Sequence, residues 1–268
     1  MTIALSWVRK IANTEELVFV SDSRLTGGYR WDTAQKVFPL TGLNAVISFA
    51  GDTALTLPVI HQIRASCENH AGTQSGATDI NVVRDHVLNI INHMRDDIKN
   101  ADPLLLEGMD RSANFILGGM SFVTGTFSQR VLRYNKSVGA FTAFKPKKPG
   151  KGPGFSMCFS GDYYMDFHER LGRLCEQRGI NKFNFEPLEV LIDMLNSGND
   201  FPSIGGSPQL VKVYKHRNVL PYAFYWNHSD QRKVHLFGRP FLNYEQTTLP
   251  IIDPGNLEIT YPLQHIKN

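Results

Sequence analysis

The spacing of apolar residues changes repeatedly along the chain, and this alternation limits the possible folds more than any other feature of the sequence. Short apolar runs, typical of strands, occupy residues 3–8, 17–21, 34–40 and 44–50. Helical spacing then predicts two helices between residues 55 and 98, with Thr78 or Asp79 as the N-cap of the second. Strand patterns return between 114 and 144, a second helix pair is expected at 163–177 and 186–196, and strands follow between 210 and 237.

Strands and helix pairs in this order predict an α+β fold. Two antiparallel sheets packed face to face, with a pair of helices on each outer face, would bury every apolar stripe, and the result is a four-layer αββα sandwich. No change in composition marks a linker between domains. The stretch 145–154 is rich in Lys, Pro and Gly, and we expect it to form a long loop because strand patterns resume on both sides.

Composition excludes several classes of function. The formal net charge is only +3 over 268 residues, and Lys145, Lys147, Lys148 and Lys151 lack interleaved aromatic residues, so no nucleic-acid partner is expected. No apolar run approaches the ~18 residues of a membrane span, and the N-terminus does not resemble a signal peptide. The three cysteines are widely separated, as in a protein of a reducing compartment. We therefore expect a cytoplasmic protein with no membrane partner.

The common motifs for metal, phosphate and serine chemistry do not occur. The sequence has no His-Glu-x-x-His helix, no Gly-x-Ser-x-Gly turn and no phosphate-binding loop. His86 and His93 could share a helix face, but two imidazoles without a third ligand are more typical of a helix surface than of a metal site. We expect no cofactor and no metal.

The N-terminus offers a different kind of nucleophile. Thr2 follows Met1, and a small second residue normally permits removal of the initiator methionine. A terminal threonine carries its hydroxyl and its α-amine on one residue. An α-amine titrates at about 7.7–8.0, so a useful fraction can accept the hydroxyl proton at neutral pH. The sequence therefore predicts a threonine nucleophile that acts as its own base once Met1 is removed.

Such a nucleophile needs a buried cation to lower the pKa of the amine, and a carboxylate to hold that cation. Asp22, Arg24 and Lys36 supply these charges close to predicted strands. Any one of them alone would be interpreted as a turn or strand-edge charge. Together with Thr2 they form a candidate catalytic group.

The first fifty residues resemble the β-type subunits of the proteasome, and the segment 17–24 (Leu-Val-Phe-Val-Ser-Asp-Ser-Arg) is most similar to the bacterial Anbu branch of that family. The resemblance implies an N-terminal nucleophile (Ntn) hydrolase fold, with Thr2 as the nucleophile and Asp22 and Lys36 as its charged partners. It also implies an oxyanion-hole role for Gly51, and substrate binding by Thr26, with a first specificity pocket formed by Leu25, Ala34, Phe49 and Thr53. Phe49 is equally well interpreted as plain core.

The likeness continues downstream with fewer specific motifs. Ser160 in Phe-Ser-Gly resembles the family's Gly-Ser-Gly element, whose serine supports the amine of the nucleophile. Asp200 and Ser203 resemble its Asp-x-x-Ser-Gly-Gly element, with one residue inserted before the two glycines. By order of elements the resemblance covers one domain, 1–238. It leaves 239–268 as a C-terminal extension that packs on the same domain or on a neighbouring subunit.

The resemblance implies a threonine-type endopeptidase that acts on peptides or proteins. It also implies assembly into a homo-oligomer, either a ring or a helical stack, and the sequence does not identify an unfoldase partner. Two alternatives remain. The same nucleophile could serve an Ntn amidohydrolase that acts on a small amide. If Met1 is retained, or if Thr2 occupies the second position of the family's pattern, the chain is a catalytically silent assembly or binding subunit.

Overall fold

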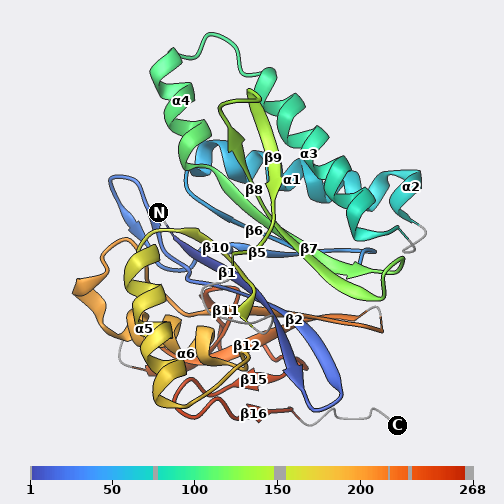
Figure 1. The fold of residues 1–268 in the computed structure, drawn as a ribbon. Coiled ribbons are helices and arrows are strands. Elements are labelled where there is room, and N and C mark those ends of the chain that lie inside the picture. The colour runs from blue at the N-terminus through green and yellow to red at the C-terminus, as the bar shows by residue number, and fades with distance from the viewer. Residues whose placement is uncertain (1, 75–77, 148–154, 217, 229–230, 263–268) are drawn as a thin grey trace.

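The computed structural model describes residues 2–74, 78–147, 155–216, 218–228 and 231–262. The protein is an α+β structure built on two large sheets, with α-helices beside each of them (Figure 1). A third, two-stranded sheet is formed by β3 (Leu25–Thr26) and β4 (Arg30–Trp31).

The larger sheet has nine strands within the described residues, and only its pair of β12 and β15 is parallel. Its order is β10 (Met157–Gly161), β1 (Ile3–Ile11), β2 (Thr14–Ser21), β11 (Gln209–Tyr214), β12 (Asn218–His228), β13 (Gln231–Leu236) and β14 (Arg239–Pro240), with β15 (Ile251–Ile252) beside β12 and β16 (Ile259–Thr260) beside β15. The other large sheet is antiparallel and has five described strands. Its order is β5 (Val37–Leu40), β6 (Ala45–Ala50), β7 (Asn114–Ser121), β8 (Thr126–Asn135) and β9 (Ala140–Phe144).

Six α-helices occur in the part of the chain that the structure describes: α1 (Thr53–Asn69), α2 (Ala71–Gln74), α3 (Ile80–Asp96), α4 (Pro103–Ser112), α5 (Tyr164–Gln177) and α6 (Glu186–Asn196). The side chains of Asp52, Asp79 and Asp102 accept hydrogen bonds from first-turn amides of α1, α3 and α4, which places the starts of these helices. Among the described residues, no helix combines the length and the apolar character needed to cross a membrane.

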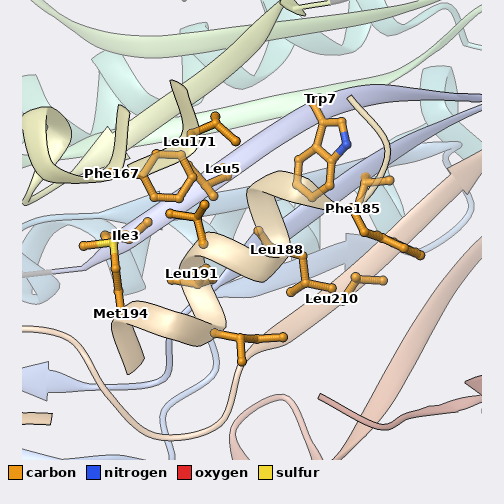
Figure 2. Packing of buried hydrophobic residues seen from close by; sticks show 14 of the residues in the cluster. Ile3, Leu5, Trp7, Phe167, Leu171, Phe185, Leu188, Leu191, Met194 and Leu210 are labelled. Atoms are coloured by element: carbon orange, nitrogen blue, oxygen red, sulfur yellow. The ribbon is translucent and has the colours of Figure 1, made fainter. Parts of the chain in front are cut away.

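Three buried clusters hold these elements together. One joins α5 and α6 to the nine-stranded sheet (Figure 2), a second joins α1 and α3 to the five-stranded sheet, and the third contains side chains from both sheets. Strand β1 contributes to two of them, because successive side chains of a strand point to opposite faces. Ile3, Leu5 and Trp7 pack with the α5 and α6 side chains, whereas Ala4 lies in the cluster shared by the sheets. A strand buried on both faces explains the nearly continuous apolar run at the N-terminus.

Most of the expected elements are present, and the differences have physical causes. The first hairpin is longer than its apolar runs indicate, because Arg9 pairs with Glu16 and Lys10 with Glu15 across β1 and β2. These cross-strand ion pairs continue the ladder with polar residues. Helix α4 was not among the expected elements, and Asp110 is its only buried residue.

Other boundaries depend on contacts from distant parts of the chain. The strand expected at 34–40 begins only at Val37, and the N-cap of α3 is Asp79 rather than Thr78. Residues after 238 form β14, β15 and β16, and β15 pairs with β12 of the same chain. Residues 148–154 of the expected loop, including Lys148 and Lys151, lie outside the described residues.

Two buried glutamines bridge the large sheets. Gln209, at the start of β11, is fully buried. Its Oε1 accepts from the backbone N–H groups of Lys36 (2.9 Å) and Val37 (3.2 Å), at the start of β5. Its Nε2 donates to the carbonyl of Ala34 (2.7 Å) and to Ser23 Oγ (2.8 Å). One side chain thus satisfies backbone groups that no strand ladder reaches.

Gln129 on β8 makes a simpler bridge. Its Oε1 accepts from Ser6 Oγ on β1 at 2.5 Å, and its Nε2 lies 3.5 Å from the carbonyl oxygen of Ser156. Gln129 is 4% exposed, so the two glutamines are similar in size and burial but differ in the number of groups they satisfy.

Replacing Gln209 by leucine is expected to lower the free energy of unfolding by about 3 kcal/mol, because several buried backbone groups lose their partners. The matched Gln129→Leu variant is expected to lose about 1 kcal/mol, since it leaves fewer groups unpaired. Urea unfolding at pH 7 measures both values. Equal losses would contradict the bridging role of Gln209.

His235 on β13 gives the fold a pH dependence. It is 3% exposed, and burial lowers its pKa from 6.5 to about 4. As the pH falls from 6.5 towards 4, the unfolded chain binds a proton that the folded protein does not, so stability falls over this window. We expect His235→Leu to lose less stability than the wild type between pH 7 and pH 4, by at most about 3 kcal/mol. Parallel urea titrations would reveal this difference, and identical pH profiles would exclude it.

Candidate active site

Thr2, Asp22 and Lys36 meet in the buried space beside β1 and β2. The ammonium group of Lys36 donates to Thr2 Oγ1 at 2.6 Å and to Asp22 Oδ1 at 3.0 Å. It also donates to the carbonyl of Arg24. These three acceptors match the three hydrogens of a protonated lysine. Thr2 is 1% exposed, and Asp22 and Lys36 are fully buried.

The carboxylate of Asp22 is held by several donors besides Lys36. Its Oδ1 accepts from the N–H of Ile3 at 3.0 Å. Its Oδ2 accepts from the N–H groups of Arg24 at 2.9 Å and Gly205 at 3.1 Å. A buried charge is tolerated only when it is paired and hydrogen-bonded in this way. Asp22 therefore links β1, its own strand end and the loop before β11 at one point.

Burial is the main influence on Lys36. It lowers the pKa of the ammonium group, because removal from water disfavours the charged form, while the negative charge of Asp22 opposes this shift. A lysine in this balance is a positive charge with a reduced affinity for its proton. A positive charge in contact with Thr2 Oγ1 is placed where it can stabilise negative charge on that oxygen.

The side chain that faces Lys36 is that of Thr2. Ile3, the next residue, belongs to the cluster under α5 and α6 and points to another face of β1 (Figure 2). The contact with Lys36 is thus made by the side chain of Thr2 and not by that of Ile3.

The backbone of β10 closes over Thr2 from another side. Gly161 has a φ of +113°, and a Cβ at this position would lie 1.7 Å from the carbonyl oxygen of Thr2. The next amide, that of Asp162, donates to the same oxygen at 2.8 Å. Only glycine permits this approach. Ser160 is 4% exposed, and its Oγ has no hydrogen-bond partner among the described residues.

Gly51 lies at the end of β6 with a φ of +103°, and a Cβ there would lie 1.9 Å from the carbonyl oxygen of Ser112. Two residues earlier, the N–H of Phe49 donates to the carbonyl of Lys36 at 3.3 Å. This bond ties the end of β6 to the Lys36 segment. Gly51 therefore follows a strand that is anchored directly to the site.

The expected pocket residues have different surroundings. Leu25, Ala34 and Phe49 are buried in the cluster that packs with α1 and α3, and Phe49 is fully buried. Thr26 is exposed on β3, and Thr53 is the partly exposed first residue of α1. Three of the four expected pocket residues thus pack as core in this structure, whereas Thr26, expected to bind substrate, is exposed.

The two named residues of the Asp-x-x-Ser motif also have different surroundings. Asp200 is exposed at the end of a short 3-10 helix, Gly198–Asp200. Ser203 donates its hydroxyl to Asp162 Oδ2 at 2.6 Å. Asp162 was not among the predicted site residues, although it directly follows the Ser160 and Gly161 motif. Gln209 was missed as well, because nothing in its local sequence indicates its distant partners, which also include the carbonyl of Asp22 at 3.3 Å from its Nε2.

The described residues contain no group of three or more His, Cys, Asp and Glu side chains that could hold a metal ion. His93 is exposed beside Asp97, whereas the ring of His86 stacks on that of His70. The side chains around Thr2 are instead suited to hydrogen bonding and charge stabilisation.

No family model matches the sequence, and a search of curated proteins finds no match. The structure is similar to that of a Gly-1 mutant of Anbu from Hyphomicrobium sp. strain MC1. The TM-score is 0.53, the sequence identity is 15%, and 88% of each chain is covered. A likeness at this identity concerns the fold. The chain therefore shares its fold with the bacterial proteasome-like protein Anbu.

Proposed function

We propose that this chain is a proteasome-like Ntn hydrolase that cleaves peptide bonds with Thr2 as its nucleophile. The observation that carries the proposal is the 2.6 Å contact between Thr2 Oγ1 and the buried Lys36 ammonium group, which Asp22 holds. The fold shared with Anbu supports it. Within this proposal, the two large sheets and their helices form the four-layer αββα sandwich of Ntn hydrolases.

The chemistry begins when everything before Thr2 is removed, because Thr2 then carries a free α-amine. The amine takes the proton of Thr2 Oγ1, directly or through water, while the oxygen attacks the carbonyl carbon of the substrate. The N–H of Gly51 stabilises the oxyanion of the tetrahedral intermediate. The amine returns the proton to the leaving amine, and an acyl ester on Thr2 remains. Water hydrolyses this ester with the same amine as base.

Lys36 and Asp22 support this chemistry by electrostatics. The ammonium charge lowers the pKa of the nearby α-amine by like-charge repulsion, so more of the amine is unprotonated at neutral pH. The same charge stabilises the alkoxide character of Thr2 Oγ1 in the transition state. The buried and unpaired hydroxyl of Ser160 is available to orient the amine.

Substrate access and assembly belong to the same proposal. Phe49 and Ala34 are buried, so a first specificity pocket that includes them is small and apolar. Thr26 is exposed on β3 and can contact an extended peptide. We propose a homo-oligomer, a ring or a helical stack, in which the domain 1–238 carries the site. The described part of the extension 239–268, up to residue 262, packs on its own domain, consistent with the pairing of β15 and β12.

Intact-mass measurement and covalent labelling test the nucleophile. We expect the purified protein to begin at Thr2 and to gain one adduct from a peptide epoxyketone, because this reagent needs both the hydroxyl and the free amine of one threonine. The Thr2→Ala variant should fold, assemble and remain unlabelled.

The outcomes separate the alternatives. A retained Met1 without an adduct would identify a catalytically silent assembly or binding subunit. Labelling of a monomer that hydrolyses a small amide but no peptide would identify an Ntn amidohydrolase. Native mass and peptide hydrolysis distinguish these two results from the proposed peptidase.

The pH dependence of Asp22→Asn tests the role of the ion pair. The charge of Asp22 raises the pKa of Lys36, against the effect of burial, so its removal should let Lys36 lose its proton at a lower pH. We expect the alkaline limb of kcat/KM to move down by about one pH unit or more, and activity to fall by about 10²-fold. An unchanged alkaline limb would mean that Lys36 does not act as a cation in the reaction.

A further inference from the structure

Asp162 lies against the nucleophile on a turn with unusual backbone geometry. Its N–H donates to the carbonyl oxygen of Thr2 at 2.8 Å. The residues on both sides, Gly161 and Tyr163, have φ values of +113° and +56°. Tyr163 precedes α5 without a side-chain cap. Left-handed backbone at a non-glycine residue is uncommon, and it persists only where the surroundings hold it.

The surroundings of Tyr163 do hold it. Its ring packs edge-on against Phe201, with 4.9 Å between the ring centroids. Its hydroxyl accepts from the N–H of Ser203 at 3.3 Å. The loop that carries Ser203 is therefore docked on the turn that carries Asp162. This docking brings the hydroxyl of Ser203 within 2.6 Å of Asp162 Oδ2.

The carboxylate of Asp162 also acts on Lys36. Its negative charge raises the pKa of Lys36, in the same direction as the charge of Asp22 and against the effect of burial. Two carboxylates therefore raise the pKa of Lys36, Asp22 in direct contact and Asp162 from the β10 side, while the positive charge of Arg24 lowers it. Asp200, the acidic residue of the Asp-x-x-Ser motif, is exposed, and the motif's serine is bonded to Asp162.

The geometry points to Asp162 as a positioning residue of the active site, paired with Ser203, which fixes Thr2 from the β10 side and adds a second negative charge near Lys36. The inference rests on the proposed function and extends it. Asp162 contacts Thr2 through its backbone, and its carboxylate acts through Ser203 and through the electrostatic field. It takes no part in forming or breaking a bond.

Asp162→Asn isolates the charge. An asparagine keeps the backbone N–H that binds the carbonyl of Thr2, and its side-chain oxygen can still accept from Ser203. The variant is therefore expected to fold normally while losing one negative charge. Asp166→Asn is the matched control, because it removes the same charge from an exposed position nearby in the sequence, in the first turn of α5.

We expect Asp162→Asn to reduce kcat about tenfold with little change in KM. Both limbs of its pH profile should move to lower pH by about half a unit, because loss of a negative charge lowers the pKa of nearby cations. Asp166→Asn should leave kcat and the pH profile as in the wild type. A shifted profile for Asp166→Asn, or an unshifted one for Asp162→Asn, would overturn the inference.

NMR titration of the Lys36 side chain separates this inference from the proposed function, because it needs no turnover. A lower pKa of Lys36 in Asp162→Asn, but not in Asp166→Asn, supports the action of Asp162 on the cation. If the wild type neither labels at Thr2 nor hydrolyses peptides, the peptidase proposal fails, and this titration still decides the inference. An equal pKa of Lys36 in the wild type and in Asp162→Asn would refute it.

Discussion

The burial of the Lys36 ammonium group is the constraint on which the rest of the structure depends. A charge removed from water costs several kcal/mol unless partners replace its hydration. Here Asp22, Thr2 and the carbonyl of Arg24 replace it together. Asp22 is itself held by amides from three separate segments, so β1, the end of β2, the start of β5 and the loop before β11 must all be in place at once. The site and the core are thus one cooperative unit.

The site also depends on two places where backbone segments approach each other closely. Gly161 and Gly51 both have positive φ values and carbonyl oxygens where a Cβ would lie. Gly161 is the last residue of β10, beside Thr2, and Gly51 directly follows β6, whose Phe49 is bonded to Lys36. Gln209 then satisfies the backbone groups of the irregular segment between Ser23 and Val37. Polar groups that the sheets leave unpaired are in this way satisfied inside the core.

The residues of the Asp-x-x-Ser motif show that closeness in sequence does not determine which side chains come into contact. Asp200 and Ser203 are close in sequence, but the chain turns between them, and the hydroxyl of Ser203 reaches Asp162. That contact is made possible by the left-handed turn at Tyr163 and by the packing of its ring on Phe201. One inserted residue, Ile204, is buried under α6 in the same loop. The spacing of the motif therefore does not specify which carboxylate the serine binds.

The sequence alone determined the class of fold, most of the helices and the group of Thr2, Asp22 and Lys36. The fold class and the helices follow from local periodicity, and the three site residues follow from polar residues beside predicted strands. Short stretches of sequence contain both kinds of information. It did not predict α4, whose only buried residue is Asp110, or β15, a two-residue strand that pairs with β12. Tertiary structure decided that Asp162 meets Thr2, that Gln209 joins the sheets and that Phe49 is fully buried. Each of these depends on contacts between segments far apart in the chain, and such contacts leave no periodic signal in the sequence.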